Sequence, residues 1–142
     1  MAQTYFGTAL RSGSGATTDS LNGGFVVLTQ TATITQNSTA VVSATFTVPA
    51  GSQIIDIVPD VLTAFDSATT AVLSVGTAAA GTQYVSAVNA KTAGRAAATI
   101  SAAQALAMAD VTTNTSVVAS VTPTGATTAG LVRVTLVYAQ KV

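Results

Sequence analysis

The sequence predicts an all-β domain of about eight strands, arranged as a β-sandwich or a barrel. From residue 25 onward, apolar residues recur with a period of two, which is the spacing of half-buried strands. Glycine and proline separate the apolar runs at near-regular intervals, as turn residues do. Threonine is abundant throughout, and its branched Cβ suits a pleated surface.

Three runs show the alternation most clearly, and each places its larger apolar side chains on one face. The shared-face residues are Val26, Leu28, Ala32 and Ile34 in the first run; Ala40, Val42, Ala44, Phe46 and Val48 in the second; and Val132, Val134, Leu136 and Tyr138 in the third. Such one-sided patterns are typical of antiparallel strands with one face on the core and one in solvent.

Five shorter runs complete the predicted set of strands. They cover residues 53–58, 61–65, 71–75, 83–88 and 115–122. Pro59 separates the first two, and a proline inside a β run belongs to a sheet edge, a bulge or a strand end.

Residues 93–110 break the pattern because they are rich in alanine. Apolar residues recur there at helical spacing, at Ile100, Ala103, Leu106 and Ala107. Thr99 or Ser101 could supply the N-cap. We expect one short helix near residues 100–109; the alternative is a long ordered loop.

The chain divides into an N-terminal arm, residues 1–24, and a β-sandwich domain, residues 25–142. The arm is rich in Gly, Ser and Thr and holds too few apolar residues to order by itself. One interpretation is a flexible leader. The other is an arm that orders on a neighbouring subunit, with Tyr5, Phe6 and Leu10 as anchors.

The composition argues against catalysis, soft-metal binding and charge-driven binding. The chain contains no His, Cys, Trp or Glu, so most side chains that transfer protons or bind soft metals near pH 7 are missing. Five basic residues balance five acidic ones, and charged residues make up 7% of the chain, against about 25% in a typical domain. We therefore expect no enzyme activity, no cofactor, and no binding to nucleic acid or membranes.

Three aspartates, Asp56, Asp60 and Asp66, could be calcium ligands or a pair of hydrolase carboxylates. On one strand Asp56 and Asp60 would lie roughly 13 Å apart, which is too far for one centre. A serine nucleophile would need Lys91 or Lys141 as its base, and neither lies in a suitable motif. We expect the carboxylates to be solvated or to cap turns.

Two segments resemble small head proteins of tailed bacteriophages. Residues 44–65 (ATFTVPAGSQIIDIVPDVLTAF) combine a strand, a Val-Pro-Ala-Gly turn and two β runs, and residues 122–140 (TPTGATTAGLVRVTLVYAQ) lead from a Gly/Thr turn into a final strand. The resemblance implies a jelly-roll-like antiparallel β-sandwich. It also implies a virion protein, made in the host cytoplasm, that decorates or cements the capsid lattice.

The partners that the resemblance implies are the major capsid protein and further copies of this chain, as a homotrimer. Two alternatives stay open: a tail, fibre or adaptor module, and a carbohydrate-binding module for host attachment. Besides the anchors of the arm, we expect Lys91, Arg95 and Arg133 to make polar contacts with a partner.

Overall fold

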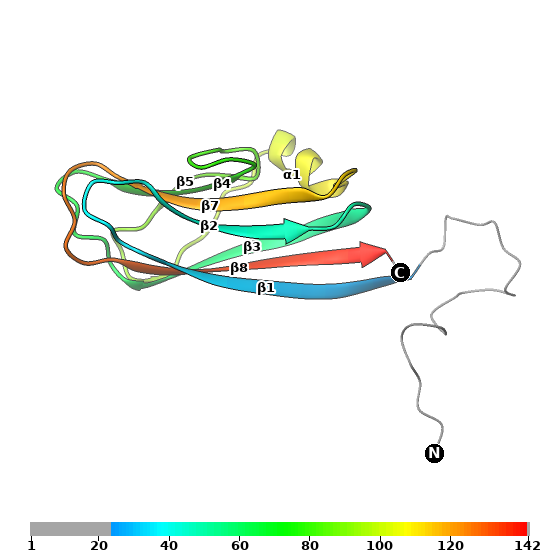
Figure 1. Cartoon of the computed structure of the whole chain (residues 1–142), viewed down its shortest axis with the longest axis horizontal. Coiled ribbons are helices and arrows are strands. Elements are labelled where there is room, and N and C mark those ends of the chain that lie inside the picture. The colour runs from blue at the N-terminus through cyan, green and yellow to red at the C-terminus, as the bar shows by residue number, and fades with distance from the viewer. Residues whose placement is uncertain (1–23, 142) are drawn as a thin grey trace, which may run out of the picture.

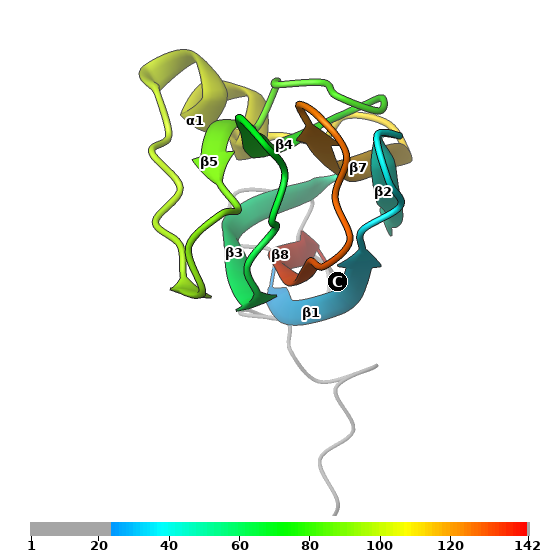
Figure 2. The same cartoon turned by 90° about the vertical axis from the view of Figure 1, so that its left-hand side faces the viewer.

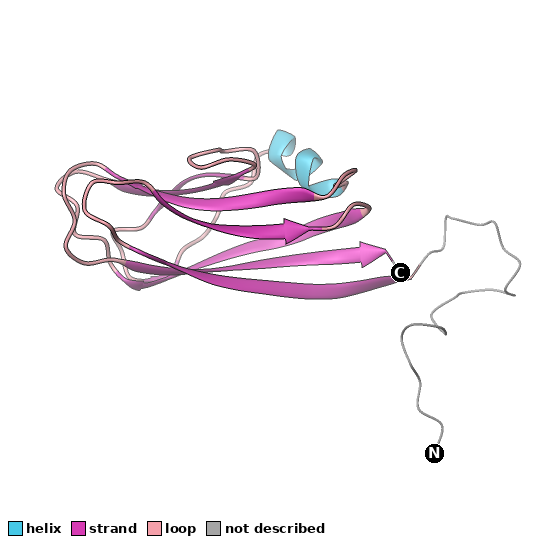
Figure 3. Cartoon of the chain, viewed as in Figure 1, coloured by secondary structure: helices cyan, strands magenta, loops and turns pink. Residues whose placement is uncertain are grey.

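The computed structural model describes residues 24–141, which form eight strands and one helix (Figures 1 and 3). The strands are β1 (Phe25–Thr35), β2 (Val42–Val48), β3 (Ser52–Thr63), β4 (Ala71–Gly76), β5 (Val85–Asn89), β6 (Gly94–Arg95), β7 (Thr115–Pro123) and β8 (Leu131–Lys141). The helix is α1 (Ala102–Ala109). No helix in this part of the chain is both long and apolar enough to cross a membrane.

The strands form two antiparallel sheets with the orders β1-β8-β3-β6 and β2-β7-β4-β5, which lie face to face (Figure 2). The first strand pairs with the last, the second with the seventh, the third with the sixth and the fourth with the fifth. These four pairs correspond to one long hairpin of the chain. When that hairpin is rolled around a core, β8 lies beside β3 and β7 lies beside β4. This is the jelly-roll arrangement, so the predicted fold class is confirmed.

The core lies between the sheets and follows the predicted alternation. Along β8 the side chains of Val132, Val134 and Leu136 are fully buried, and Tyr138 is 6% exposed. Burying each such side chain contributes about 1.5–3 kcal/mol of hydrophobic stabilisation. The inward faces of β1 and β2 also have the predicted parity.

The structure corrects the prediction around Pro59, because one continuous strand, β3, replaces the two expected runs. The carbonyl of Pro59 accepts a hydrogen bond from the N–H of Ala96 at 3.0 Å. The backbone polar groups of Pro59 therefore face away from β8, where a missing N–H costs no bond to that strand. The two-residue strand β6 lies in the alanine-rich stretch 93–110, before the expected helix.

The helix is confirmed, and Ser101 is its N-cap. The Ser101 hydroxyl accepts from the N–H of Gln104, and the Gln104 side chain accepts from the N–H of Ser101, which completes a capping box. The predicted apolar face is wrong, since Leu106 is 77% exposed while Gln104 and Met108 are buried. Gln104 Nε2 donates to the carbonyl of Thr82 at 2.9 Å, and this bond rotates the polar residue inward.

Candidate interaction surface

The outward side of the β1-β8-β3-β6 sheet, called here the outer face, carries most of the predicted polar contacts. Regular pairing between β1 and β8 places threonines of one strand beside outward residues of the other. The outer face includes Phe25, Val27, Thr29, Thr31, Thr33 and Thr35 on β1. It also includes Arg133, Thr135, Val137 and Ala139 on β8, and Ile55, Asp56, Val58 and Asp60 on β3.

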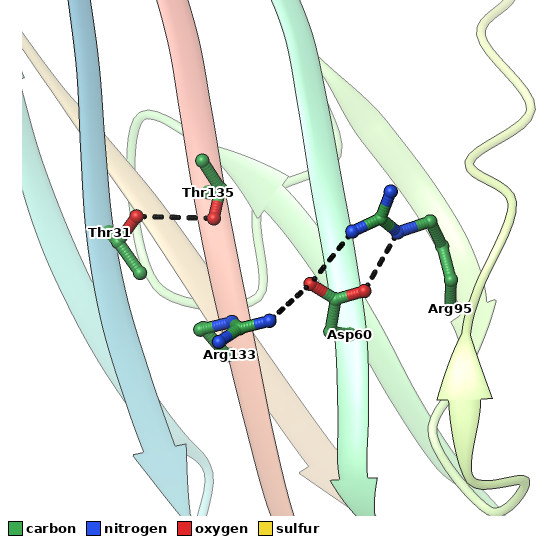
Figure 4. A network of polar contacts seen from close by, with 5 residues as sticks. All are labelled: Thr31, Asp60, Arg95, Arg133 and Thr135. Atoms are coloured by element: carbon green, nitrogen blue, oxygen red, sulfur yellow. Dashed lines mark hydrogen bonds and ion pairs between the residues drawn. The ribbon is translucent and has the colours of Figure 1, made fainter.

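One half of the outer face is polar and is organised around Asp60 (Figure 4). Arg95 Nε donates to Asp60 Oδ1 at 2.8 Å, and Arg133 donates to Asp60 Oδ2 at 3.0 Å. The Asp60 side chain is 12% exposed, whereas those of Arg95 and Arg133 are 70% and 45% exposed. Hydrogen bonds from Arg95, then from Arg133, lower the pKa of Asp60 below its usual 3.8. The carboxylate therefore holds both guanidinium groups while leaving much of each open to solvent.

The remaining polar groups of this half are neutral or compensated. The hydroxyls of Thr31 and Thr135 share a hydrogen bond of 3.1 Å across β1 and β8 (Figure 4). Asp56 brings the number of carboxylates to two, and its Oδ1 accepts from the N–H of Ile57 at 2.8 Å. Among the side chains of the outer face that the structure describes, two arginines thus face two aspartates, and these charges balance.

The other half of the outer face carries exposed apolar side chains around the polar residue Gln53, which pairs with Ala139. Phe25 and Val27 are 53% and 61% exposed, and Ile55 is 48% exposed. A register shift between Ile54 and Asp56 inserts Ile55 as an extra residue on β3. Exposed apolar residues that lie together, rather than singly, are typical of surfaces that bind a partner.

The predicted contact residues separate into three groups. Arg95 and Arg133 lie on the outer face and share one carboxylate. Lys91 does not join them, because its Nζ donates to the carbonyls of Ser67 and Thr69 at 2.6 and 3.2 Å and holds that loop. The predicted anchors Tyr5, Phe6 and Leu10 lie outside the described residues.

Two features of this surface escaped the sequence analysis. The sequence predicts a solvated or turn-capping carboxylate at Asp60, and this prediction is wrong because Asp60 is buried and bound to two arginines. Nothing in the sequence pairs position 60 with position 133. The exposed apolar end could have been found from Phe25-Val26-Val27-Leu28, where consecutive apolar residues must occupy both faces of one strand.

The third aspartate, Asp66, organises a turn. Its carboxylate accepts from the N–H and the hydroxyl of Thr128 at 2.8 and 2.5 Å, and from the N–H of Ala129 at 3.1 Å. These bonds, led by that from the Thr128 hydroxyl, lower the pKa of Asp66 from 3.8 to about 2. Across residues 24–141, no three acidic side chains come together in a way that could hold a metal ion.

Two open depressions lie near the edge formed by β3 and β5. One, of about 360 Å³, lies between β3 and residues 95–98; the other, of about 570 Å³, lies between residues 82–87 and the start of α1. Neither is lined by an aromatic ring on which a sugar could stack. Tyr84 and Tyr138 are 5% and 6% exposed, so neither ring is available on the surface, and the Tyr138 hydroxyl accepts from Gln30.

Comparison of the chain with protein families, with curated proteins and with solved structures finds no match.

Proposed function

We propose that this chain is a structural protein of a bacteriophage particle that decorates or cements the capsid. The observation that supports the proposal most is the outer face, a broad sheet surface on which the two arginines and two aspartates balance and one end carries exposed apolar side chains. The resemblance of residues 44–65 and 122–140 to phage head proteins supplies the particle as the target.

The outer face is suited to packing against protein because docking would bury few charges without a partner. An unpaired charge that is buried at an interface costs several kcal/mol. Asp60 already has two cationic partners, so covering it does not leave its carboxylate unsatisfied. The exposed parts of Arg95 and Arg133 remain able to donate hydrogen bonds to carbonyls or carboxylates of the capsid protein. Arginine is enriched at protein–protein interfaces in general.

Association of the chain into a trimer would strengthen such docking. Each trimer would present three outer faces to the lattice, and linked weak contacts bind far more tightly than one. Because the protein would bind the assembled shell and not its free subunits, it would shift the equilibrium toward the intact shell.

Mass spectrometry of purified virions, combined with add-back to shells that lack this protein, tests the proposal. We expect hundreds of copies per particle and a higher disassembly temperature after add-back. The Arg133→Ala/Arg95→Ala variant should bind the shells more weakly. Asp110→Asn, a change at an exposed carboxylate that follows α1 and is not part of the outer face, should bind as the wild type does. Absence from virions, together with no binding to shells, would refute a role in the particle.

The same measurement separates the alternatives. Tens of copies or fewer per particle would assign the chain to a tail, fibre or adaptor. Reproducible binding in a glycan screen, without binding to shells, would favour a host-attachment module.

A further inference from the structure

The two long edges of the sandwich differ in how well they are protected. A free strand edge presents unpaired N–H and C=O groups and invites another strand, so soluble proteins protect their edges with prolines, bulges, charges or covering segments. One edge of this molecule is formed by β3, β6 and β5, and the other by β1 and β2.

The edge at β3 carries several of these protective devices. Pro59 offers no N–H, the N–H of Ile57 is capped by the Asp56 carboxylate, and Ile55 forms a bulge. Ser52 is bridged to Val111. On the neighbouring sheet β5 is short, is irregularly paired with β4, and is tied to α1 by Gln104.

Within residues 24–141, the edge at β1 has none of these devices. The strand is 11 residues long, reads FVVLTQTATIT, and pairs with β8 without a register shift. It therefore contains no charge, no proline, no glycine and no bulge. Among the residues that the structure describes, no strand pairs with the other side of β1.

The pairing with β8 shows which backbone groups of β1 remain available. The N–H of Gln36 donates to the carbonyl of Gly130 at 2.9 Å. Because successive residues of a strand direct their polar groups to opposite sides, the odd-numbered residues of β1 direct theirs away from β8. These residues are Phe25, Val27, Thr29, Thr31, Thr33 and Thr35.

The second strand of this edge, β2, is similar and complementary. It reads VSATFTV, pairs regularly with β7, and has no partner strand on its other side in residues 24–141. β1 and β2 run in opposite directions along the same edge of the molecule (Figure 1). A side-chain hydrogen bond of 2.8 Å from Gln30 to the carbonyl of Thr47 links them.

The hydrophobic core is also less covered at the β1/β2 edge. Leu28 points inward beside Tyr138, yet it is 38% exposed. At the protected edge, the inward residues Ile57 and Val85 are 2% and 0% exposed. Incomplete cover thus coincides with the free backbone groups.

From these observations we infer that the β1/β2 edge is the contact between copies of this chain, and that β1 of one copy adds antiparallel to β2 of the next. In a ring whose axis runs along the strands, every β1 points one way and every β2 the other, so each such contact is antiparallel. The contact closes the core at Leu28 and leaves the outer face free to dock. This inference rests on the self-association proposed above and names the surface that performs it.

The size of the edge is adequate for a stable contact. An 11-residue strand spans about 36 Å, and two sheets about 10 Å apart, with their side chains, are roughly 20 Å deep. The contact would cover roughly 700 Å² per copy, close to the ~800 Å² per partner of a standard interface. Neither β1 nor β2 carries a charge that would repel its counterpart.

Light scattering coupled to gel filtration, on the full chain, tests this inference. We expect an oligomer for the wild type and a mass that falls to the 13.9 kDa of the monomer for Thr29→Pro/Thr33→Pro. Both prolines remove only N–H groups that point away from β8, so the circular dichroism spectrum should stay that of a folded β protein. Thr29→Lys/Thr33→Lys should have the same effect without a proline, because charge protects an edge. Ala97→Lys/Thr99→Lys places the same charge on the protected edge and should leave the oligomer intact.

Three results would overturn the inference: a wild-type monomer at high concentration, an oligomer that survives both β1 variants, or an oligomer lost only in Tyr5→Ser/Phe6→Ser/Leu10→Ser. The last result would identify the N-terminal segment as the contact. If both β1 variants remain oligomeric and still bind to shells, the edge contact is wrong but the proposed function is not contradicted.

Discussion

Asp60 on β3 lies directly opposite Arg133 on β8, and the Asp60 carboxylate accepts a hydrogen bond from that guanidinium at 3.0 Å. The same carboxylate accepts from Arg95 on β6, so one side chain connects three adjacent strands of a sheet. β6 pairs with β3 at only two positions, which makes this side-chain link a large part of what holds it in place.

Replacing Asp60 with Asn should destabilise the fold at neutral pH. The substitution keeps the shape but leaves Arg95 and Arg133 without a counter-charge, so we expect a lower melting temperature. The pKa of Asp60 is lowered in the folded state, so its stabilisation is present above the usual 3.8 and is lost as the pH falls through the lower folded value. The difference between variant and wild type should therefore shrink in acid. Asp110→Asn is the control, and an equal loss in both variants would contradict the role of Asp60.

Asp66 should make a separate contribution to acid sensitivity. Its pKa is about 2 in the folded protein against a usual 3.8. The carboxylate therefore stabilises the fold fully above pH 3.8, and this stabilisation should disappear between about pH 3.8 and about pH 2. Melting curves collected from pH 7 to pH 2 should show a smaller loss across this window for Asp66→Asn than for the wild type. Parallel curves for the two proteins would contradict the assignment.

Gly130 should not tolerate a side chain. A Cβ at this position would lie 2.5 Å from atoms of the Phe65 ring, which is 1% exposed and cannot move into solvent. We expect Gly130→Ala to lower the free energy of unfolding by about 1–3 kcal/mol, as overpacking of a core does. Urea denaturation measures the change. Gly51→Ala, where the added Cβ meets nothing within 4 Å, controls for loss of glycine alone, although its φ of +73° makes alanine strained there too. A smaller effect at Gly130 than at Gly51 would contradict the steric argument.

Ser101 should be the residue that starts α1. Ser101→Ala removes the acceptor for the N–H of Gln104 and should cost about 1 kcal/mol of stability. Thr99→Ala, at the other cap candidate, should have no measurable effect because α1 begins after Ser101. Urea denaturation of both variants checks the prediction, and equal losses would show that the capping box adds little.

Much of the fold could be predicted because the alternation is local information. The stripe from Val132 to Tyr138 specifies a strand and its buried face without reference to any other part of the chain. The helix was located by the same reasoning, but its buried face was not. Gln104 lies inward because Thr82, 22 residues away, offers a carbonyl, and no local pattern records such a partner.

For the candidate surface, the sequence predicts some of the residues involved but not their arrangement. The sequence predicts polar contacts with a partner for Lys91, Arg95 and Arg133. The convergence of the two arginines on Asp60 depends on the register of β3 with β8 and β6. Pro59 was expected at an edge, a bulge or a strand end, and only the three-dimensional pairing shows it within a continuous strand.

The sequence alone determined that this protein is an all-β domain with few charges, because side-chain periodicity and composition act residue by residue. Tertiary structure decided which strands became neighbours. It thereby decided which carboxylate meets which guanidinium, and which edge has no partner strand among residues 24–141. The physical reason is that strand pairing joins residues distant in the chain: Asp60 and Arg133 are 73 positions apart, and only the rolled hairpin brings them within hydrogen-bonding distance.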